Sequence, residues 1–121
     1  MKRTVLSIDD SKAIRDMIGF TLEPQGFRVI GAGDGAEGLK KLRAEPVALV
    51  ITDLNMPVMN GFEFIIAARK EPAGAGIPIV MLTTESKPEM KAKGKAAGAT
   101  GWINKPFDAD MLVAVTRKLI G

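Results

Sequence analysis

The 121-residue sequence contains no cysteine, no histidine and no tyrosine. Without cysteine the chain cannot form disulfides, thiol nucleophiles, iron–sulfur clusters or cysteine-based zinc sites. Without histidine it has no imidazole for a catalytic triad, a metal ligand, a proton shuttle or a phosphohistidine. The chemistry left to the chain uses carboxylates, hydroxyls, lysines, backbone groups and hard metal ions.

Long hydrophobic runs are absent as well. The longest are five residues, such as residues 47–51, which is far too short for a membrane-spanning helix. At the amino terminus, Asp9 and Asp10 come before an apolar signal core could develop, which argues against a secretory signal. We therefore expect a cytoplasmic protein with no membrane partner.

The charge balance is mildly basic. The chain has 17 lysines and arginines against 14 aspartates and glutamates, with a net charge of +3 and a sequence pI near 9.3. A high pI can indicate nucleic-acid binding. However, the basic residues are spread along the chain, and its one tryptophan offers little surface on which bases could stack. We expect no nucleic-acid partner.

Short apolar segments rich in valine and isoleucine alternate with segments of helical spacing. The predicted strands are Thr4–Ile8, Phe27–Ala32, Ala48–Thr52, Ile79–Leu82 and Thr100–Asn104. The predicted helices are a segment that begins at the N-cap Ser11, includes Leu22 and stops near Pro24 and Gly26, then Gly35–Ala44, Phe62–Glu71, Lys87–Ala97, and a segment from the N-cap Asp108 to Leu119.

This alternation predicts right-handed βαβ units and a three-layer α/β fold. Several strands are continuously apolar, which is typical of parallel strands buried on both faces. The length suits one domain over residues 1–121. The stretch Pro72–Gly76 is expected to be a flexible turn between a helix and the next strand.

Polar side chains follow four of the five predicted strands. They are Asp9 and Asp10 after the first strand, Asp53 after the third, Thr83 and Thr84 after the fourth, and Asn104 and Lys105, followed by Pro106, where the fifth ends. The carboxyl ends of parallel strands share one sheet edge, where ligands of open α/β sheets bind. Three carboxylates gathered there repel one another unless they share a cation.

The donor types at this edge favour Mg²⁺ and a phosphoryl group. Mg²⁺ prefers oxygen ligands and binds through one or two carboxylates plus phosphate oxygens. Lys105 would neutralise the phosphoryl charge, and the Thr83 hydroxyl can donate to another phosphoryl oxygen. Taken singly, Asp10 is explained as part of a helix cap and Lys105-Pro106 as a turn boundary. The combination at four strand ends favours a functional site.

The motifs resemble the receiver domain of two-component response regulators, in particular the single-domain chemotaxis type. The matching pieces, in order within Val5–Leu119, are Ile8-Asp9-Asp10-Ser11, Thr52–Gly61, Met81–Thr84 and Asn104-Lys105-Pro106-Phe107. The resemblance implies a flavodoxin-like (βα)5 three-layer sandwich with a parallel sheet in the order 2-1-3-4-5. It also implies a monomeric receiver domain that fills the chain.

The resemblance further implies a role for each matching position. Asp53 would accept a phosphoryl group from a sensor histidine kinase, with Mg²⁺ held by Asp9, Asp10, Asp53 and the backbone carbonyl of Asn55. Thr83, Thr84 and Lys105 would bind the phosphoryl group, and the Lys105–Pro106 bond is often cis in the family. Asn55 and Glu85 would tune dephosphorylation towards a short-lived signal. Such a chain is a stoichiometric phosphoacceptor that assists its own phosphorylation and dephosphorylation, and is no ordinary enzyme.

In the family, the switch couples a hydroxyl to an aromatic ring, and these positions are Thr83 and Trp102 here. The family more often has tyrosine or phenylalanine, and an indole is larger and needs a partner for its N–H. Either Trp102 changes rotamer when Thr83 moves, or its ring simply covers the sheet edge. The sequence leaves both alternatives open.

Lys87, Lys91 and Lys95 form a basic stripe at helical spacing. The stripe is either a solvated face or, together with Trp102, a docking surface for an acidic downstream protein such as a flagellar switch component.

Three other functions compete with this interpretation. Residues 33–38 match G-x-G-x-x-G, a dinucleotide-binding pattern, but Asp34 and Glu37 place negative charge where a pyrophosphate would approach. A Mg²⁺-dependent aspartyl-phosphate phosphohydrolase would be expected to have a second acidic residue two positions after Asp53. This chain has Asn55 at that position, which argues against such an enzyme. The main alternative is that the chain is one receiver module of a larger regulator, which the sequence does not refute.

Overall fold

In the computed structural model, which describes residues 2–121, five strands alternate with five α-helices and one short 3-10 helix. They are β1 (Thr4–Ile8), α1 (Lys12–Leu22), η1 (Glu23–Gln25), β2 (Arg28–Ala32), α2 (Gly35–Ala44), β3 (Leu49–Thr52), α3 (Gly61–Arg69), β4 (Ile79–Thr83), α4 (Pro88–Ala97), β5 (Gly101–Asn104) and α5 (Ala109–Ile120). The predicted elements are all found, and their ends differ by one or two residues, except that α1 ends at Leu22 and η1 occupies the stretch up to the predicted stop near Pro24 and Gly26. Within the described residues, no helix has the length and apolar character needed to cross a membrane.

The strands form one parallel sheet in the order β2-β1-β3-β4-β5, as the resemblance implied. Val5 on β1 lies opposite Val29 on one side and Leu49 on the other, so β1 is a central strand. From β1 the chain passes through α1 to β2 on one side, and from β2 it crosses through α2 to β3 on the other side of β1. This reversal places a crevice at the carboxyl ends of β1 and β3, where ligands bind in such sheets.

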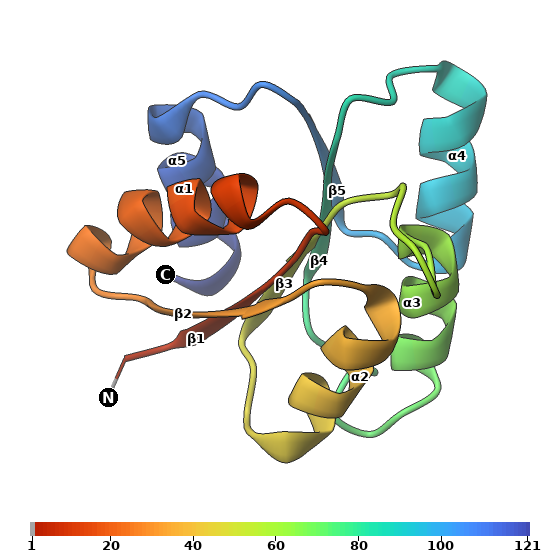
Figure 1. Cartoon of the computed structure of the whole chain (residues 1–121), viewed down its shortest axis with the longest axis horizontal. Helices are drawn as coiled ribbons and strands as arrows, with labels where there is room; N and C mark the ends of the chain where they lie inside the picture. Colours follow the sequence, from red (N-terminus) through yellow and green to blue (C-terminus); the bar gives the residue numbers. More distant parts are fainter. Residues whose placement is uncertain (1) are drawn as a thin grey trace.

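Helices cover both faces of the sheet (Figure 1), α1 and α5 on one face and α2, α3 and α4 on the other. Each face has its own hydrophobic core. Leu6, Val50 and Phe64 belong to the core under α2 and α3, whereas Val5 and Leu49 belong to the core under α1 and α5. Every residue of β1, β3 and β4 is buried. The continuously apolar strands are therefore the central ones, as predicted, and the fold is the flavodoxin-like (βα)5 sandwich.

Polar side chains fix the points at which the helices begin. The Ser11 Oγ accepts a hydrogen bond from the Ile14 N–H at 3.3 Å, and the Asp108 carboxylate caps α5 in the same way. Asn60 and Glu63 form a reciprocal capping box at α3, with both hydrogen bonds at 2.9 Å. These caps satisfy the first N–H groups of the helices and hold the loops at the carboxyl edge of the sheet.

The segment Pro72–Gly76 forms turns between α3 and β4, as predicted, and the side chain of Arg69 bonds to it. The Arg69 guanidinium donates to the carbonyls of Gly74 at 2.8 Å and Ile77 at 2.5 Å, and also to the carbonyl of Gly98 at 2.7 Å. Burial lowers the pKa of Arg69. One guanidinium thus connects the end of α3 to the following loop and to the end of α4.

The glycine pattern at residues 33–38 serves packing. The Glu37 carboxylate accepts a hydrogen bond from the Gly33 N–H, and the Asp34 carboxylate accepts one from the Glu37 N–H, both at 2.8 Å. Two carboxylates therefore occupy the N-terminus of α2, where a pyrophosphate would bind. A Cβ at Gly38 would lie 2.5 Å from Ile8 Cδ1 and 3.2 Å from Phe64 Cε1. This arrangement argues against the dinucleotide-binding alternative.

Replacing Gly38 with alanine tests this packing role. Overpacking against the buried Ile8 and Phe64 costs about 1–3 kcal/mol, and the gain in helix propensity returns only about 1 kcal/mol. We expect Gly38→Ala to lower the free energy of unfolding in urea, whereas Gly33→Ala, where an added Cβ meets nothing within 4 Å, leaves it nearly unchanged. Equal effects of the two substitutions would contradict the packing explanation.

Candidate functional site

Three carboxylates converge at the carboxyl edge of the sheet. Asp9 and Asp10 follow β1, and Asp53 follows the adjacent strand β3. One carboxylate oxygen from each lies within 4.8 Å of the other two. Asp9 is 2% exposed and Asp53 is 9% exposed, whereas Asp10 faces solvent. The structure therefore brings together the three acids that the strand-end pattern selected.

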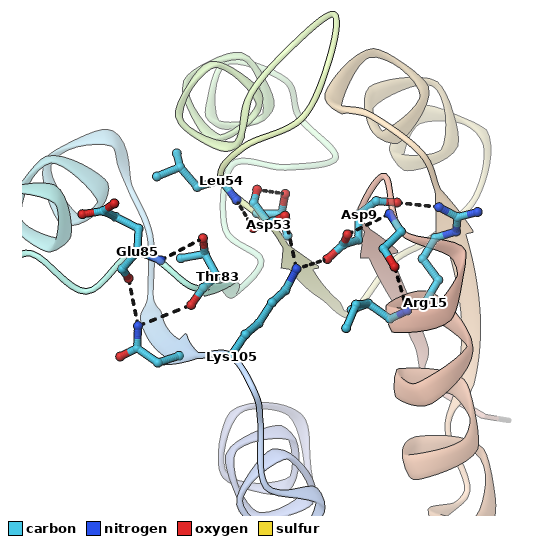
Figure 2. A network of polar contacts seen from close by, with 11 residues as sticks. Asp9, Arg15, Asp53, Leu54, Thr83, Glu85 and Lys105 are labelled. Carbon is cyan, nitrogen blue, oxygen red and sulfur yellow. Dashed lines mark hydrogen bonds and ion pairs between the residues drawn. The ribbon is translucent and has the colours of Figure 1, made fainter.

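Lys105 joins two of these acids from the loop after β5. Its Nζ lies 2.7 Å from Asp9 Oδ2 and 3.2 Å from Asp53 Oδ2. Figure 2 shows the extended lysine side chain between the two carboxylates. The Lys105–Pro106 peptide bond is cis, as the resemblance implied. One ammonium group thus bridges residues from the first and third strands.

Burial and charge act together on the protonation of this group. Burial raises the pKa of Asp9, and the nearby Asp53 charge raises it further, against the lowering effect of hydrogen bonds from Lys105 and the Ser11 N–H. Burial alone would lower the pKa of Lys105, but the carboxylates of Asp9 and Asp53 outweigh it and raise the pKa. Lys105 is therefore a stable ammonium ion at neutral pH.

Backbone groups fix the second oxygen of each buried carboxylate. Asp9 Oδ1 accepts a hydrogen bond from the Ser11 N–H at 2.9 Å, and Asp53 Oδ1 accepts one from the Leu54 N–H at 2.8 Å. On the main chain, the Asp9 carbonyl accepts a hydrogen bond from Arg15 Nη1 at 2.5 Å. Arg15 was not predicted as a site residue. Its only sequence signal is its position one turn into the helix that follows the acidic pair.

The donor set fits a hard divalent cation. The three acids carry three negative charges and Lys105 one positive charge, which leaves an excess of two if all are ionised. The available ligands are oxygens, as Mg²⁺ prefers. Asn55, whose backbone carbonyl is the fourth expected ligand, is an exposed residue in the same loop as Asp53. Asp9, Asp10, Asp53 and Asn55 are therefore the residues that would hold Mg²⁺.

Hydrogen bonds connect the segment from Thr83 to Glu85, at the end of β4, to Lys105 and its neighbour at the end of β5 (Figure 2). Thr83 ends β4 and is wholly buried, and its carbonyl accepts a hydrogen bond from the Lys105 N–H at 2.9 Å. The Asn104 side chain donates to the carbonyls of Thr83 at 3.3 Å and Glu85 at 2.8 Å. The next residue, Thr84, is exposed. Asn104 had no predicted role, because nothing in the sequence shows that it joins these loops.

Trp102 on β5 is half-buried, and its indole N–H has a partner. The Nε1 donates to the Glu85 carbonyl at 2.9 Å, the same carbonyl that accepts from Asn104. The ring packs against the hydrophobic core under α2 and α3, at the side of that core where α4 lies. A half-buried indole N–H needs an acceptor whether the ring switches or only covers the sheet edge. The geometry is compatible with either of the two roles that the sequence left open.

The basic stripe is exposed, and part of it adjoins Trp102. Lys91, Lys95 and Trp102 line a shallow groove of about 270 Å³ between α4 and β5. Lys87 is the N-cap of α4 and does not line this groove. The structure therefore brings together three of the four residues predicted as a partner surface.

Comparison with known proteins agrees with the geometry. The family model for the response regulator receiver domain matches residues 5–117. The chemotaxis response regulator CheY4 of Vibrio cholerae is 44% identical in sequence, with a TM-score of 0.92, and the match covers 98% of this chain and 99% of that one.

Two further matches extend this comparison. The phosphate regulon transcriptional regulatory protein PhoB of Escherichia coli is 34% identical over 94% of this chain and 50% of its own length. The chain thus spans about half the length of that curated relative. The receiver domain of the sensor histidine kinase PA1611 from Pseudomonas aeruginosa, solved with a magnesium ion in its active site cleft, has a TM-score of 0.91 over 100% of this chain and 99% of that one. At 22% identity, it supports the shared fold alone.

Removing the Lys105 ammonium tests its electrostatic role in the apoprotein. Lys105→Met leaves the carboxylates of Asp9 and Asp53 without their shared partner, which costs about 1–3 kcal/mol. We expect a lower free energy of unfolding in urea without divalent cations, and partial recovery when Asp9→Asn is added. Lys40→Met, at an exposed position on α2, is the matched control and should have little effect. Equal stability of Lys105→Met and the control would contradict this account.

Proposed function

The chain belongs to the response regulator receiver domain family, whose members act as phosphorylation-activated switches in two-component signalling, and on this premise we propose that Asp53 is its phosphoacceptor. The observation that carries the proposal is the bridge from Lys105 to both Asp9 and Asp53 at the carboxyl edge of the sheet. The proposed phosphodonor is the phosphohistidine of a sensor histidine kinase, which is the donor that the receiver family uses.

In the transfer step, a carboxylate oxygen of Asp53 attacks the phosphorus of the phosphohistidine. A P–O bond forms, the P–N bond breaks, and its electron pair returns to the imidazole of the kinase. Phosphoryl transfer has a loose transition state, so positioning and charge neutralisation supply most of the acceleration. A weakly basic carboxylate is therefore a sufficient nucleophile when it is held as Asp53 is held.

The residues around Asp53 supply this positioning. The Leu54 N–H fixes Asp53 Oδ1, which leaves the other oxygen, now near Lys105, to react. When that oxygen forms the acyl phosphate, Lys105 is within reach of the phosphoryl oxygens and neutralises their charge. The Thr83 hydroxyl, and Thr84 beside it, would donate to the remaining oxygens.

Mg²⁺ bound by Asp9, Asp10, Asp53 and the Asn55 carbonyl would supply additional positive charge for the phosphoryl oxygens. The fit of the donor set supports this role.

Dephosphorylation returns the carboxylate. A water oxygen attacks the phosphorus, the bond from phosphorus to the Asp53 oxygen breaks, and inorganic phosphate leaves. Asn55 and Glu85, two residues beyond Asp53 and Thr83, are polar and would help to orient this water. The chain thus assists its own phosphorylation and dephosphorylation once per phosphoryl group, and turns over no separate substrate. Asn55 replaces the second acid expected of a phosphohydrolase, which disfavours that alternative.

The signal would leave the domain through Thr83 and Trp102. A phosphoryl oxygen that attracts the Thr83 hydroxyl also moves the β4–α4 loop, whose Glu85 carbonyl holds the indole N–H. Movement of Trp102 would then change the surface that it shares with Lys91 and Lys95. Lys87 extends this surface at the start of α4.

The proposed reader of this surface is an acidic protein, and the similarity to CheY4 favours a chemotaxis target such as a flagellar switch component. The length of PhoB supports the second candidate, in which the same domain serves a larger regulator. Both candidates use the same phosphoacceptor chemistry, and the mass of the natural gene product distinguishes them.

Phosphorylation by a small donor tests the phosphoacceptor. After incubation with Mg²⁺ and acetyl phosphate, mass spectrometry should show a single phosphate adduct that hydroxylamine removes. We expect no adduct in Asp53→Asn, because the amide is not a nucleophile, and a normal adduct in Asp16→Asn, which changes an exposed acid on α1. Persistence of the adduct in Asp53→Asn, or its absence from the unmodified protein, would refute the proposal.

Charge reversal tests the docking surface. Binding of a purified flagellar switch protein to the beryllofluoride-treated domain should weaken at least several-fold in Lys91→Glu/Lys95→Glu, and should weaken with added salt. Lys40→Glu controls for the change in net charge, because Lys40 is on α2, and α3 separates that helix from α4 (Figure 1). Unchanged affinity in the double variant would show that the basic stripe only faces solvent.

A further inference from the structure

Helix α4 rests on two aromatic rings through a single glycine. Gly94 is the one buried residue of α4. A Cβ at Gly94 would lie 2.8 Å from Trp102 Cζ3, 3.3 Å from Trp102 Cε3 and 3.4 Å from Phe62 Cε1. The first of these distances is closer than carbon atoms can approach without movement. The backbone of α4 therefore reaches the indole only because residue 94 has no side chain.

The helix itself gives no reason for a glycine at this position. Gly94 lies inside α4 with helical geometry, so the conformational freedom of glycine is not required. Glycine is the poorest helix former apart from proline, and the flanking α4 residues are mostly alanine and lysine, which favour helices. The close approach of Trp102 is the physical reason that the structure offers for the glycine.

The far end of the same indole is held by the loop next to the proposed phosphorylation site. Trp102 Nε1 donates to the Glu85 carbonyl at 2.9 Å, two residues after the buried Thr83. On the other ring, Lys93 Nζ lies 5.0 Å from the centroid of Phe62, which adds a cation–π contact between α3 and α4. The indole thus contacts α4 on one side and is hydrogen-bonded to the β4–α4 loop on the other.

We propose that Gly94 is a positioning residue that holds Trp102 beneath α4, and that the size of residue 94 sets how readily the indole leaves this position. The first half of this proposal, that Gly94 positions Trp102, concerns the unphosphorylated fold alone. The second half, that residue 94 sets how readily the indole moves, rests on the proposed function, because it makes the contact between Gly94 and Trp102 part of the signalling switch. A larger residue at 94 must displace either the ring or the helix, and the ring has the groove lined by Lys91 and Lys95 beside it.

Substitutions of Gly94 and Trp102, alone and together, test the contact without phosphorylation. In Gly94→Ala we expect Trp102 emission to shift to longer wavelength and acrylamide quenching to increase, since the ring becomes more exposed. We also expect a lower urea midpoint, despite the gain in helix propensity. In a Trp102→Phe background the smaller ring leaves room for the Cβ, so Gly94→Ala should raise the midpoint instead. Ala92→Gly, at an exposed α4 position, measures the helix-propensity effect alone.

The sign of the Gly94→Ala effect in the two backgrounds decides the first half of the proposal. A higher midpoint in both backgrounds, with unchanged Trp102 emission, would overturn it, because alanine would then act only through helix propensity. If Gly94→Ala does not fold on its own, recovery of folding by Trp102→Phe supports the contact, and failure of that pair to fold overturns it.

Beryllofluoride titration with Mg²⁺ tests the second half. We expect Gly94→Ala to reach half of its Trp102 emission change at a lower beryllofluoride concentration than the unmodified protein. The alanine Cβ already destabilises the inward position of the ring, so less free energy is needed to move it. An unchanged or higher concentration would overturn this part. Acetyl phosphate labelling of Asp53 distinguishes the two proposals: absence of labelling refutes the phosphoacceptor, whereas normal labelling without coupling between residues 94 and 102 refutes only the role of Gly94.

Discussion

The repulsion among the acids at the sheet edge is the constraint around which the rest of the structure is arranged. Asp9 and Asp53 come from adjacent central strands, so the sheet holds their carboxylates close together whether or not a cation is present. Lys105 offsets part of this repulsion, and it reaches the acids because the Thr83 carbonyl accepts the hydrogen bond of its N–H and Asn104 connects the loops. A buried group of like charges with one ammonium is stable enough to fold and retains an affinity for further positive charge.

The fold was predictable because its strongest signals are local and repeated. The strands β1, β3 and β4 are mostly apolar and wholly buried, and caps such as Ser11 and Asp108 begin helices where polar residues follow the strands. The turn after α3 was predicted from its composition, but the contact that holds it was not, because the Arg69 guanidinium lies outside the segment. A long side chain that bonds carbonyls leaves no spacing pattern in the sequence.

The same distinction separates the predicted parts of the site from those that were missed. Asp9, Asp53 and Lys105 were predictable because parallel strands end at one edge, so strand order alone brings these residues together. The bond from Asn104 to Glu85 and the approach of Gly94 to Trp102 depend on the shapes of loops and of one ring. The roles of the individual residues came from the family resemblance, and the geometry supplies the reason that these positions can perform them.

The Arg69 guanidinium has a mechanical consequence for α4. It bonds the carbonyl of Gly98, the C-cap of α4, and also two carbonyls of the loop before β4. A rigid rod fixed at one end can rotate about that end but cannot slide along its own axis. If α4 rotates about its C-terminal end, each residue moves further the greater its distance from Gly98. The displacement would therefore be largest at Pro88, the end of α4 nearest the acids, even when the rotation of the helix axis is small.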